Sequence, residues 1–339
     1  MKKKIKNIVI LTTNYDQKKS DGVSEVIFNI IKNSHHNKNF IFNFEVIDKK
    51  NFFKKIKFFF KEDTFHFHGC WHPIFIIFYL LRYLNKKIYL NTHGMLSKSS
   101  FAQKPFQKKL IWFFYQKKIV DNCNIIFVNS EKELVEVRNL TKNRINKINN
   151  GLVFSDLLYN KKKINTKKIN FFFFSRLHKS KGIEDLLDAW GDINFAENES
   201  ILRIYATGKE KYVKYIKEKI KNNRNNKSIF FYNNKLPSKK QIFKNNDVMI
   251  LPSKSESFGI VILEALYSGN YVITTQNTPW KNDIHRRLYI IKNKKKAIVN
   301  VIQNCINHSN KVFQKSSTSK FNYKIYSWKK IVHQYLEFF

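Results

Sequence analysis

Residues 247–266 read DVMILPSKSESFGIVILEAL. The run 247–251 has the length and composition of a buried strand that ends at Pro252, and a polar loop leads from there to Glu256. A helix then opens at Gly259. A buried strand followed by a polar loop and a helix is the repeating unit of parallel sheets, so this stretch predicts an α/β fold.

Apolar runs of strand length alternate with helical patterns along the whole chain. In the first half we predict strands at 6–11, 41–47, 64–68, 87–91 and 124–129, separated by helices at 24–32, 73–84, 105–122 and 131–140. In the second half we predict strands at 169–174, 201–206, 228–232, 247–251 and 271–275, separated by helices at 182–190, 209–222, 239–245 and 259–268. Ser130 and Glu133 predict a capping box at the start of the helix at 131–140.

A turn signal at 149–151 and a polar, charged run at 160–168 divide the two series. We predict two Rossmann-like doubly wound domains that face each other across a cleft, where the carboxyl ends of the strands bind the ligand. The predicted parts are an N-terminal domain at 1–155, a linker at 156–168, a C-terminal domain at 169–320 and a C-terminal helix within 321–339 that packs against the domains.

The chain of 339 residues carries 63 Lys and Arg against 25 Asp and Glu, a formal net charge of +38. This excess is spread evenly, because residues 1–155 hold 28 basic and 11 acidic residues and the remainder holds 35 and 14. A nucleic-acid-binding arm would concentrate the charge. We therefore expect a mostly solvated basic surface, part of which meets an anionic partner, and no nucleic acid partner.

Signals of the cellular compartment are few. The three cysteines, Cys70, Cys123 and Cys305, have no paired spacing, as expected in a reducing cytosol. The apolar run at 8–11 is too short for the core of a signal peptide, and no uncharged apolar stretch reaches the ~20 residues of a membrane span. We expect a cytoplasmic protein.

Charged residues lie beside the predicted strand ends of the second half. Glu256 precedes the helix start at Gly259, where free N–H groups suit a phosphate, and Glu264 lies roughly 9 Å further along the axis. The two carboxylates are placed to hold sugar and ribose hydroxyls. Arg176 follows a strand and Lys181 precedes a helix, so both are placed to neutralise a departing diphosphate. The alternatives are that Glu256 is a simple helix cap, that Glu264 is a salt-bridged helix residue and that Lys181 is a surface lysine.

These motifs resemble the signature of the retaining glycosyltransferases of family four (glycosyltransferase group one), which adopt the GT-B fold. The Glu–seven residues–Glu motif of that family matches Glu256 and Glu264, and its donor-diphosphate Arg and Lys match Arg176 and Lys181. No Asp-x-Asp metal motif is present, and we expect no metal and no cofactor. The resemblance implies a donor site formed by Arg176, Lys181, Glu256, Ser257, Phe258, Gly259, Ile260 and Glu264. It gives catalytic roles to His93, Glu256, Arg176 and Lys181.

The first half carries looser matches to the same family. Residues 21–24, DGVS, resemble the glycine-containing first loop, with Asp21 in the place of the first glycine. Residues 92–94, THG, resemble the segment that bears the active-site histidine. His68 ends a neighbouring predicted strand and supports His93. The resulting acceptor side comprises Asp21, Gly22, His68 and His93.

A metal site is an alternative for part of this region. His66, His68, Cys70 and His72 alternate, so on one continuous strand they would share a face. However, glycine and proline end the strand here, and same-face residues of an extended strand lie about 7 Å apart. We therefore expect no metal.

Two segments interleave basic and aromatic residues, FFKKIKFFFK at 52–61 and KPFQKKLIWFFYQKK at 104–118. Either segment could lie on an anionic membrane surface. The alternative is a core helix with solvated lysines. Because many members of the resembled family glycosylate lipid-linked acceptors, the resemblance implies a peripheral position on the inner face of the cytoplasmic membrane.

We thus predict a retaining, metal-independent glycosyltransferase that moves a sugar from a UDP- or GDP-type donor to a glycan or lipid-linked acceptor. The implied process is the synthesis of a cell-surface polysaccharide such as capsule, lipopolysaccharide or exopolysaccharide. Two alternatives stay open: a nucleotide-sugar epimerase of similar architecture and a basic nucleic-acid-binding protein.

Overall fold

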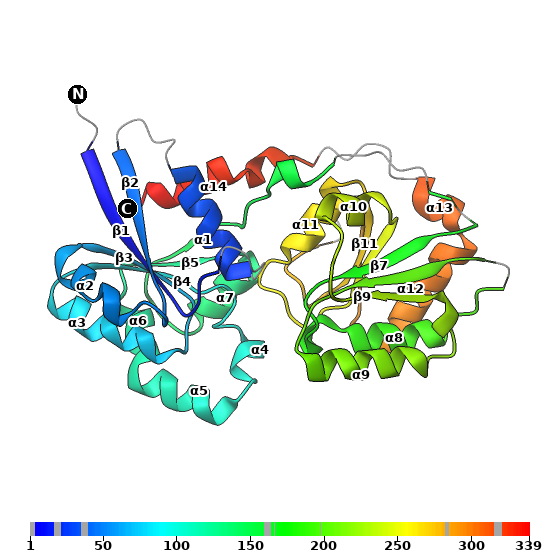
Figure 1. The fold of residues 1–339 in the computed structure, drawn as a ribbon, viewed down its shortest axis with the longest axis horizontal. Coiled ribbons are helices and arrows are strands. Elements are labelled where there is room, and N and C mark those ends of the chain that lie inside the picture. Colours follow the sequence, from blue (N-terminus) through cyan, green and yellow to red (C-terminus); the bar gives the residue numbers. More distant parts are fainter. Residues whose placement is uncertain are drawn as a thin grey trace. The chain divides into compact units, whose positions relative to one another are not determined.

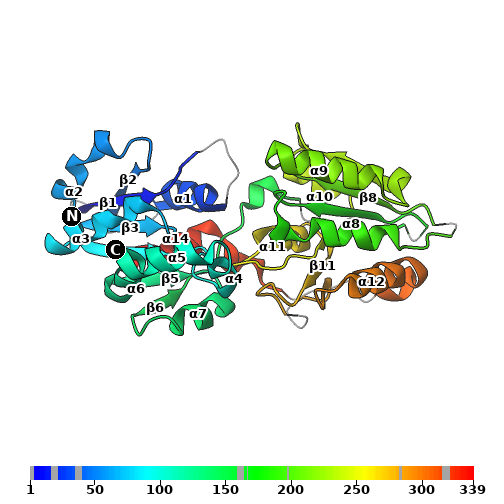
Figure 2. The same ribbon diagram turned by 90° about the horizontal axis from the view of Figure 1, so that it is seen from below.

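The computed structural model describes residues 4–16, 22–34, 40–158, 164–165, 167–196, 198–281, 285–314 and 321–339. The chain forms two compact units, Met1–Gly151 with Lys324–Phe339, and Leu152–Tyr323. Each unit is a six-stranded parallel sheet with helices on both faces (Figures 1 and 2). The predicted α/β class with two Rossmann-like doubly wound sheets is confirmed. Residues 159–163 and 166 of the predicted linker lie outside the described residues.

The sheet of the first unit has the strand order β2-β1-β3-β4-β5-β6. Its strands are β1 (Lys4–Thr12), β2 (Phe40–Ile47), β3 (Thr64–His68), β4 (Lys87–Asn91), β5 (Ile125–Val128) and β6 (Ile145–Lys147). β1 pairs with β2 on one side and with β3 on the other. The carboxyl ends of β1 and β3 are therefore a topological switch point, where ligands of such sheets bind.

Eight α-helices cover the described part of this sheet. They are α1 (Gly22–Asn33), α2 (Lys57–Lys61), α3 (Phe78–Tyr83), α4 (Lys98–Phe101), α5 (Pro105–Ile111), α6 (Lys117–Asn122), α7 (Glu131–Arg138) and α14 (Trp328–Leu336). The predicted helix at 105–122 is one run whose middle part, Trp112–Gln116, is π-helical. The C-terminal helix α14 packs against α1, and Nδ2 of Asn91 donates a hydrogen bond to Oη of Tyr335 over 2.6 Å.

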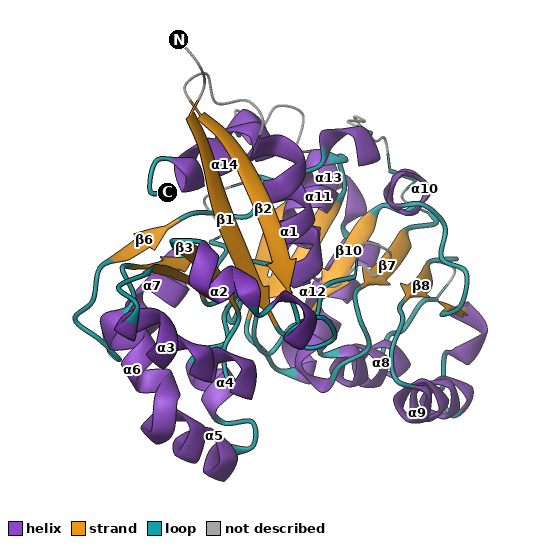
Figure 3. Cartoon of the chain, turned by 60° about the vertical axis from the view of Figure 1, so that its left-hand side comes forward, coloured by secondary structure: helices purple, strands orange, loops and turns teal. Residues whose placement is uncertain are grey.

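The sheet of the second unit has the order β12-β11-β10-β7-β8-β9, and its strands appear in orange in Figure 3. They are β7 (Asn170–Phe174), β8 (Ile201–Tyr205), β9 (Ile229–Tyr232), β10 (Val248–Leu251), β11 (Tyr271–Thr275) and β12 (Leu288–Ile291). The helices are α8 (Ile183–Gly191), α9 (Glu210–Lys221), α10 (Lys239–Lys244), α11 (Ile260–Tyr267), α12 (Lys295–Asn307) and α13 (Ser309–Gln314). β7 and β10 are neighbours, and the strand order reverses between them.

Three strands, β5, β10 and β11, are buried along their whole length, which explains the unbroken apolar sequences of β5 and β10. Strands covered by helices on both faces have no solvated side on which polar residues could alternate. Polar side chains therefore gather mainly at the strand ends and in the loops that follow them, which is where the candidate site lies.

Candidate active site

Two loops meet at the switch point of the second unit, one after β7 and one after β10. Gly182 is the N-cap residue of α8 and has a φ of +72°. A Cβ on Gly182 would lie 2.1 Å from the carbonyl oxygen of Pro252, and the N–H of Lys254 donates to the carbonyl of Ser180 over 2.7 Å. The two loops therefore pack backbone against backbone, which the absence of a side chain at position 182 permits.

This packing brings Lys181 to Glu256. Nζ of Lys181 lies 2.6 Å from Oε1 of Glu256, and the two side chains are 17% and 8% exposed. Oγ of Ser253 donates to the same carboxylate oxygen over 2.8 Å. A carboxylate this buried requires partners for its charge, and the ammonium and the hydroxyl supply them. Because an ammonium has three N–H groups, Lys181 retains donors for a ligand while it holds Glu256.

Positive charge gathers on the loop after β7. Arg176 is exposed on this loop. Burial lowers the pKa of His178, and the charges of Arg176, Lys181 and Lys209 lower it further. Nδ1 of His178 accepts from the N–H of Ser180 over 3.2 Å, which fixes the ring within the loop. The loop thus presents cations and a neutral imidazole at the switch point.

The start of α11 completes this edge of the sheet. Gly259 is its N-cap residue with a φ of +75°, and no side chain among the described residues caps the helix. The first N–H groups of α11 therefore carry the positive end of the helix dipole. Nε1 of Trp280 donates to the carbonyl of Phe258 over 2.6 Å, and the two rings pack at 5.4 Å. Ser257 and Ile260 lie half-buried beside them.

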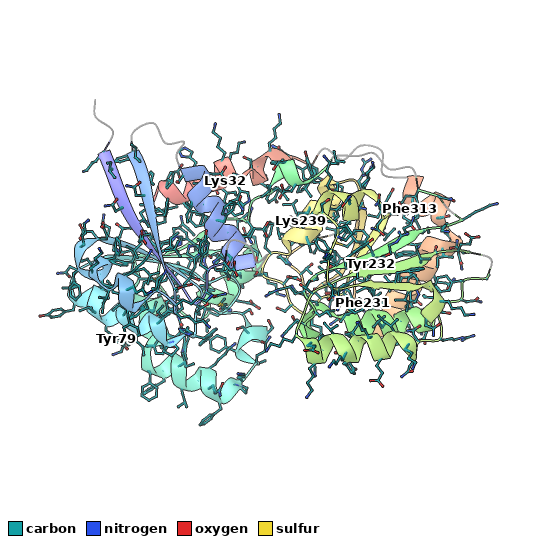
Figure 4. The ribbon with its side chains drawn as sticks, viewed as in Figure 1. Lys32, Tyr79, Phe231, Tyr232, Lys239 and Phe313 are labelled. Carbon is teal, nitrogen blue, oxygen red and sulfur yellow. The ribbon has the colours of Figure 1, made fainter. Side chains whose placement is uncertain are left out.

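Glu264 lies in α11 and is 3% exposed. Its Oε1 accepts from Nζ of Lys239 over 2.7 Å; Lys239 is the first residue of α10 and is labelled in Figure 4. The sequence predicted Glu264 as a site residue but not Lys239. The signal for Lys239 was the capping box of Ser238 and Gln241, which places Lys239 in the first turn of α10. Both predicted carboxylates are thus held by lysines.

The first unit brings His68 and His93 together, as the sequence predicted for neighbouring strand ends. Nδ1 of His68 lies 3.0 Å from Nε2 of His93, and Nε2 of His68 lies 3.1 Å from Nδ1 of His66. Burial lowers the pKa of His66 to about 3 and that of His93 to about 4, and it holds the pKa of His68 well below its usual value. All three imidazoles are therefore neutral at pH 7.

Glu133 holds the loop that carries His93. Its carboxylate accepts from the N–H of Gly94 and the hydroxyl of Thr92 over 2.5 Å each, and from the N–H of Asn129 over 2.8 Å. The predicted capping box is only half formed, because Oγ of Ser130 accepts from the N–H of Glu133 while the Glu133 carboxylate bonds these other groups. The bonds have a larger role, because His93 has a φ of +48° and a left-handed non-glycine residue needs a surrounding structure that imposes it.

The sequence also singled out Asp21 and Gly22 on the acceptor side, and Cys70 and His72 in the alternating run. Asp21 lies outside the described residues, and Gly22 is the exposed first residue of α1. Nδ1 of His72 accepts from the N–H of Ile74, and the N–H of Cys70 donates to Met95. Within the described ranges, no group of three or more His, Cys, Asp or Glu residues could hold a metal ion.

Known proteins resemble the chain in sequence and in fold. Residues 155–316 match the family of glycosyl transferases group 1. The chain carries a group 1 glycosyltransferase domain. A relative from Klebsiella pneumoniae, an uncharacterized 41.2 kDa protein in the cps region, is 25% identical over 228 residues, which cover 63% of this chain. The match spans 60% of that relative's own length.

Solved structures share the fold of both units. HepE of Anabaena, in complex with UDP and glucose, gives a TM-score of 0.75 at 15% identity, covering 98% of this chain and 99% of HepE. Sucrose-phosphate synthase of Thermosynechococcus elongatus gives 0.74 at 14%, covering 98% of each chain. WaaG, a glycosyltransferase involved in lipopolysaccharide biosynthesis, gives 0.68 at 11%, covering 97% of this chain and 95% of WaaG. The predicted GT-B fold is confirmed, and the group 1 domain supports the predicted enzyme class, a glycosyltransferase.

The group 1 domain contains the predicted donor-site residues, from Arg176 to Glu264. His68 and His93 lie before it, in the first unit. None of the helices in the described part of the chain is both long enough and apolar enough to cross a membrane.

Proposed function

We propose that this glycosyltransferase is a retaining, metal-independent enzyme that moves a sugar from a UDP- or GDP-type nucleotide sugar to a glycan or lipid-linked acceptor. The observation that carries the proposal is the 2.6 Å pair of Lys181 and Glu256 at the switch point between β7 and β10. A cation and a carboxylate that share one loop junction, with Arg176 beside them, fit the diphosphate and the sugar of one ligand.

The donor half of the reaction follows from these contacts. When the bond between the anomeric carbon and the diphosphate oxygen breaks, negative charge moves onto the diphosphate. Arg176, Lys181 and the first N–H groups of α11 stabilise that charge, so the cations take the role that a divalent metal has in other transferases. Glu256, fixed by Lys181, accepts from sugar hydroxyls, and Glu264, fixed by Lys239, accepts from ribose hydroxyls.

The acceptor half involves the first unit. His93 and Gly22 contact the acceptor side, with His68 and Asp21 in support. In a retaining transfer the acceptor oxygen bonds to the anomeric carbon on the face that the diphosphate leaves. The departing phosphate oxygen lies on that same face and takes the proton of the acceptor hydroxyl.

Two comparisons support narrower substrates. HepE has been solved with UDP and glucose and also with UDP-glucose, so UDP-glucose is the first donor to test. The Klebsiella pneumoniae relative belongs to a cps region, and WaaG is involved in lipopolysaccharide biosynthesis. Both support a role in the synthesis of a capsule or another cell-surface polysaccharide.

The acceptor reaches the enzyme at an anionic membrane surface in this proposal. Phe106, Phe113 and Phe114 are 74%, 78% and 65% exposed, and Leu110 is also exposed. Their spacing places them on one face of the helical run at 105–122, so they do not serve the core. Exposed lysines border this face at positions 104, 109, 117 and 118. Apolar side chains ringed by lysines fit a lipid surface with negative headgroups.

A neighbouring element extends the same apolar surface. Tyr79 of α3, labelled in Figure 4, donates from Oη to the carbonyl of Phe114 over 2.6 Å. Tyr83 and Phe53 are also exposed. Peripheral contact here would place the enzyme on the inner face of the cytoplasmic membrane, where nucleotide sugars and lipid-linked acceptors meet.

The test is incubation of the full chain with UDP-glucose, first alone and then with a bacterial lipid extract. Acceptor-dependent release of UDP supports the transferase, and retention follows if the new linkage has the anomeric configuration of the donor. Epimerised donor in the absence of acceptor would favour the epimerase. Tight, steeply salt-dependent binding to an oligonucleotide would favour the nucleic-acid-binding protein.

A further inference from the structure

The imidazoles of His66, His68 and His93 form one hydrogen-bonded chain. The links are the 3.1 Å and 3.0 Å contacts already described, and the ends are Nε2 of His66 and Nδ1 of His93. Nε2 of His66 is buried and has no hydrogen-bond partner within the described part of the chain. The rings of Phe127, Tyr335 and Phe339 pack against the imidazole of His66, with their centroids 5.2 to 5.7 Å from the centroid of that imidazole.

Each neutral imidazole has one N–H and one lone pair, so each link needs a donor on one side only. The three protons must therefore all point along the chain in the same direction. Either every proton sits on Nδ1, and His66 donates to His68, which donates to His93. Or every proton sits on Nε2, and the donation runs from His93 inward.

The buried end decides between these two arrangements. With the protons on Nε2, the N–H of His66 would be buried without a hydrogen-bond acceptor among the described residues, and buried unpaired N–H groups are rare in proteins because they lose a full hydrogen bond. With the protons on Nδ1, Nε2 of His66 carries only an unpaired lone pair. This arrangement costs less than an unpaired N–H, since unpaired buried acceptors are less rare in proteins than unpaired buried donors. Burial keeps all three imidazoles neutral, so neither end is a cation.

We infer that the buried chain fixes His93 as the Nδ1–H tautomer, so that His93 acts as a hydrogen-bond donor toward the substrate and not as a base. The lone pair of its Nε2 is already occupied by His68, and its Nδ1 carries the proton. His68 is a positioning residue that acts through His93. The inference rests on the proposed function only in naming the acceptor of this bond, a sugar oxygen.

The test is nuclear magnetic resonance of the full chain labelled with [15N]histidine, in the absence of any nucleotide. We expect a protonated Nδ1 and an unprotonated Nε2 for His93, assigned by its disappearance in His93→Gln. A proton on Nε2 of His93 in the wild-type protein would overturn the inference. This measurement requires no enzyme activity, so its result does not depend on whether the proposed transferase function is correct.

A pair of variants separates positioning from a general loss of structure. In His68→Asp the carboxylate accepts from His93, so the proton should move to Nε2. In His68→Leu, of similar bulk, the two nitrogens of His93 should share the proton. An unchanged Nδ1–H tautomer in His68→Asp would contradict the role of His68. If the transferase is confirmed, kcat with UDP-glucose should fall at least 10-fold in His68→Asp, because His93 then offers a lone pair where a donor is required.

Discussion

Nζ of Lys181 lies 2.6 Å from Oε1 of Glu256, although 75 positions separate the two residues in the sequence. The pairing of β7 with β10 makes the contact possible, because it places the loops after both strands side by side. One residue offers donors for a diphosphate and the other an acceptor for sugar hydroxyls. Their contact means that each also fixes the other's position.

Removing the carboxylate at position 256 should abolish transfer while the protein remains folded. Glu256→Ala removes the acceptor for sugar hydroxyls and the partner that positions Lys181. We expect kcat with UDP-glucose to fall by at least about 10²-fold, the usual scale for losing a positioned polar group at a reacting centre. Glu256→Gln keeps the shape but not the charge and should be similarly impaired. Wild-type rates in Glu256→Ala would refute the role of this residue.

The close packing of the two loops predicts a sharp effect at Gly182. In Gly182→Ala the new Cβ would meet the carbonyl oxygen of Pro252 at 2.1 Å, and the residue would keep a left-handed backbone. The loops must separate, so we expect both a lower melting temperature and weaker UDP binding. The matched control is Gly191→Ala at the end of the same helix, where the nearest atom is 3.4 Å from the new Cβ. Equal UDP binding in the two variants would contradict the proposed loop contact.

The neutral histidines of the first unit predict acid sensitivity. An unfolded histidine has a pKa of about 6.5, whereas burial lowers the pKa of His93 to about 4 and that of His66 to about 3. The unfolded chain therefore binds protons that the folded chain excludes. The free energy of unfolding should have its full value above pH 6.5. At lower pH it should decrease by about 1.4 kcal/mol per pH unit for each such histidine.

Urea titrations at pH 7 and pH 5 measure this effect. His93→Gln should show a shallower loss of stability over the same range, because one of the three groups no longer titrates. A free energy of unfolding that is the same at both pH values would show that these imidazoles are not held neutral.

The sequence predicted the alternation of elements well where its signals are local. The strands at 64–68, 87–91 and 271–275 have the predicted bounds, since each is a short apolar run between polar loops. The short strand β6 and the segment with β12 and α12 were not predicted. Only two residues of β6 are even partly buried, so its sequence carries little hydrophobic signal.

The candidate site was predicted in its residues but not in its contacts. Glu256, Glu264, Arg176 and Lys181 were recognised from local motifs. The direct bond of Lys181 to Glu256 depends on strand order, which no local pattern encodes. The partner of Glu264, Lys239, is one of 63 Lys and Arg residues, so its type alone distinguishes nothing. The alternation of His66 with other histidines and Cys70 resembled a metal site, but His66 is the buried end of a hydrogen-bonded chain of imidazoles.

The exposed aromatic face at 105–122 predicts binding to anionic vesicles. The full chain should co-sediment with vesicles that contain phosphatidylglycerol and should be released by salt, because lysines surround the apolar side chains. Replacing Phe113 and Phe114 together by serine should weaken this binding several-fold without loss of stability, since both side chains are exposed. Replacing the exposed Tyr215 of the second unit by serine is the control. No binding at low salt would contradict contact of this face with an anionic membrane.

The central claim is that Arg176 and Lys181 bind the diphosphate of a nucleotide-sugar donor, and titration calorimetry with UDP-glucose tests it most directly. Arg176 is exposed, so Arg176→Ala should leave the melting temperature unchanged. The account predicts that wild-type protein and Lys179→Ala, a neighbouring exposed lysine, bind UDP-glucose alike, whereas Arg176→Ala binds at least 10-fold more weakly. Equal affinity in Arg176→Ala and Lys179→Ala would contradict it.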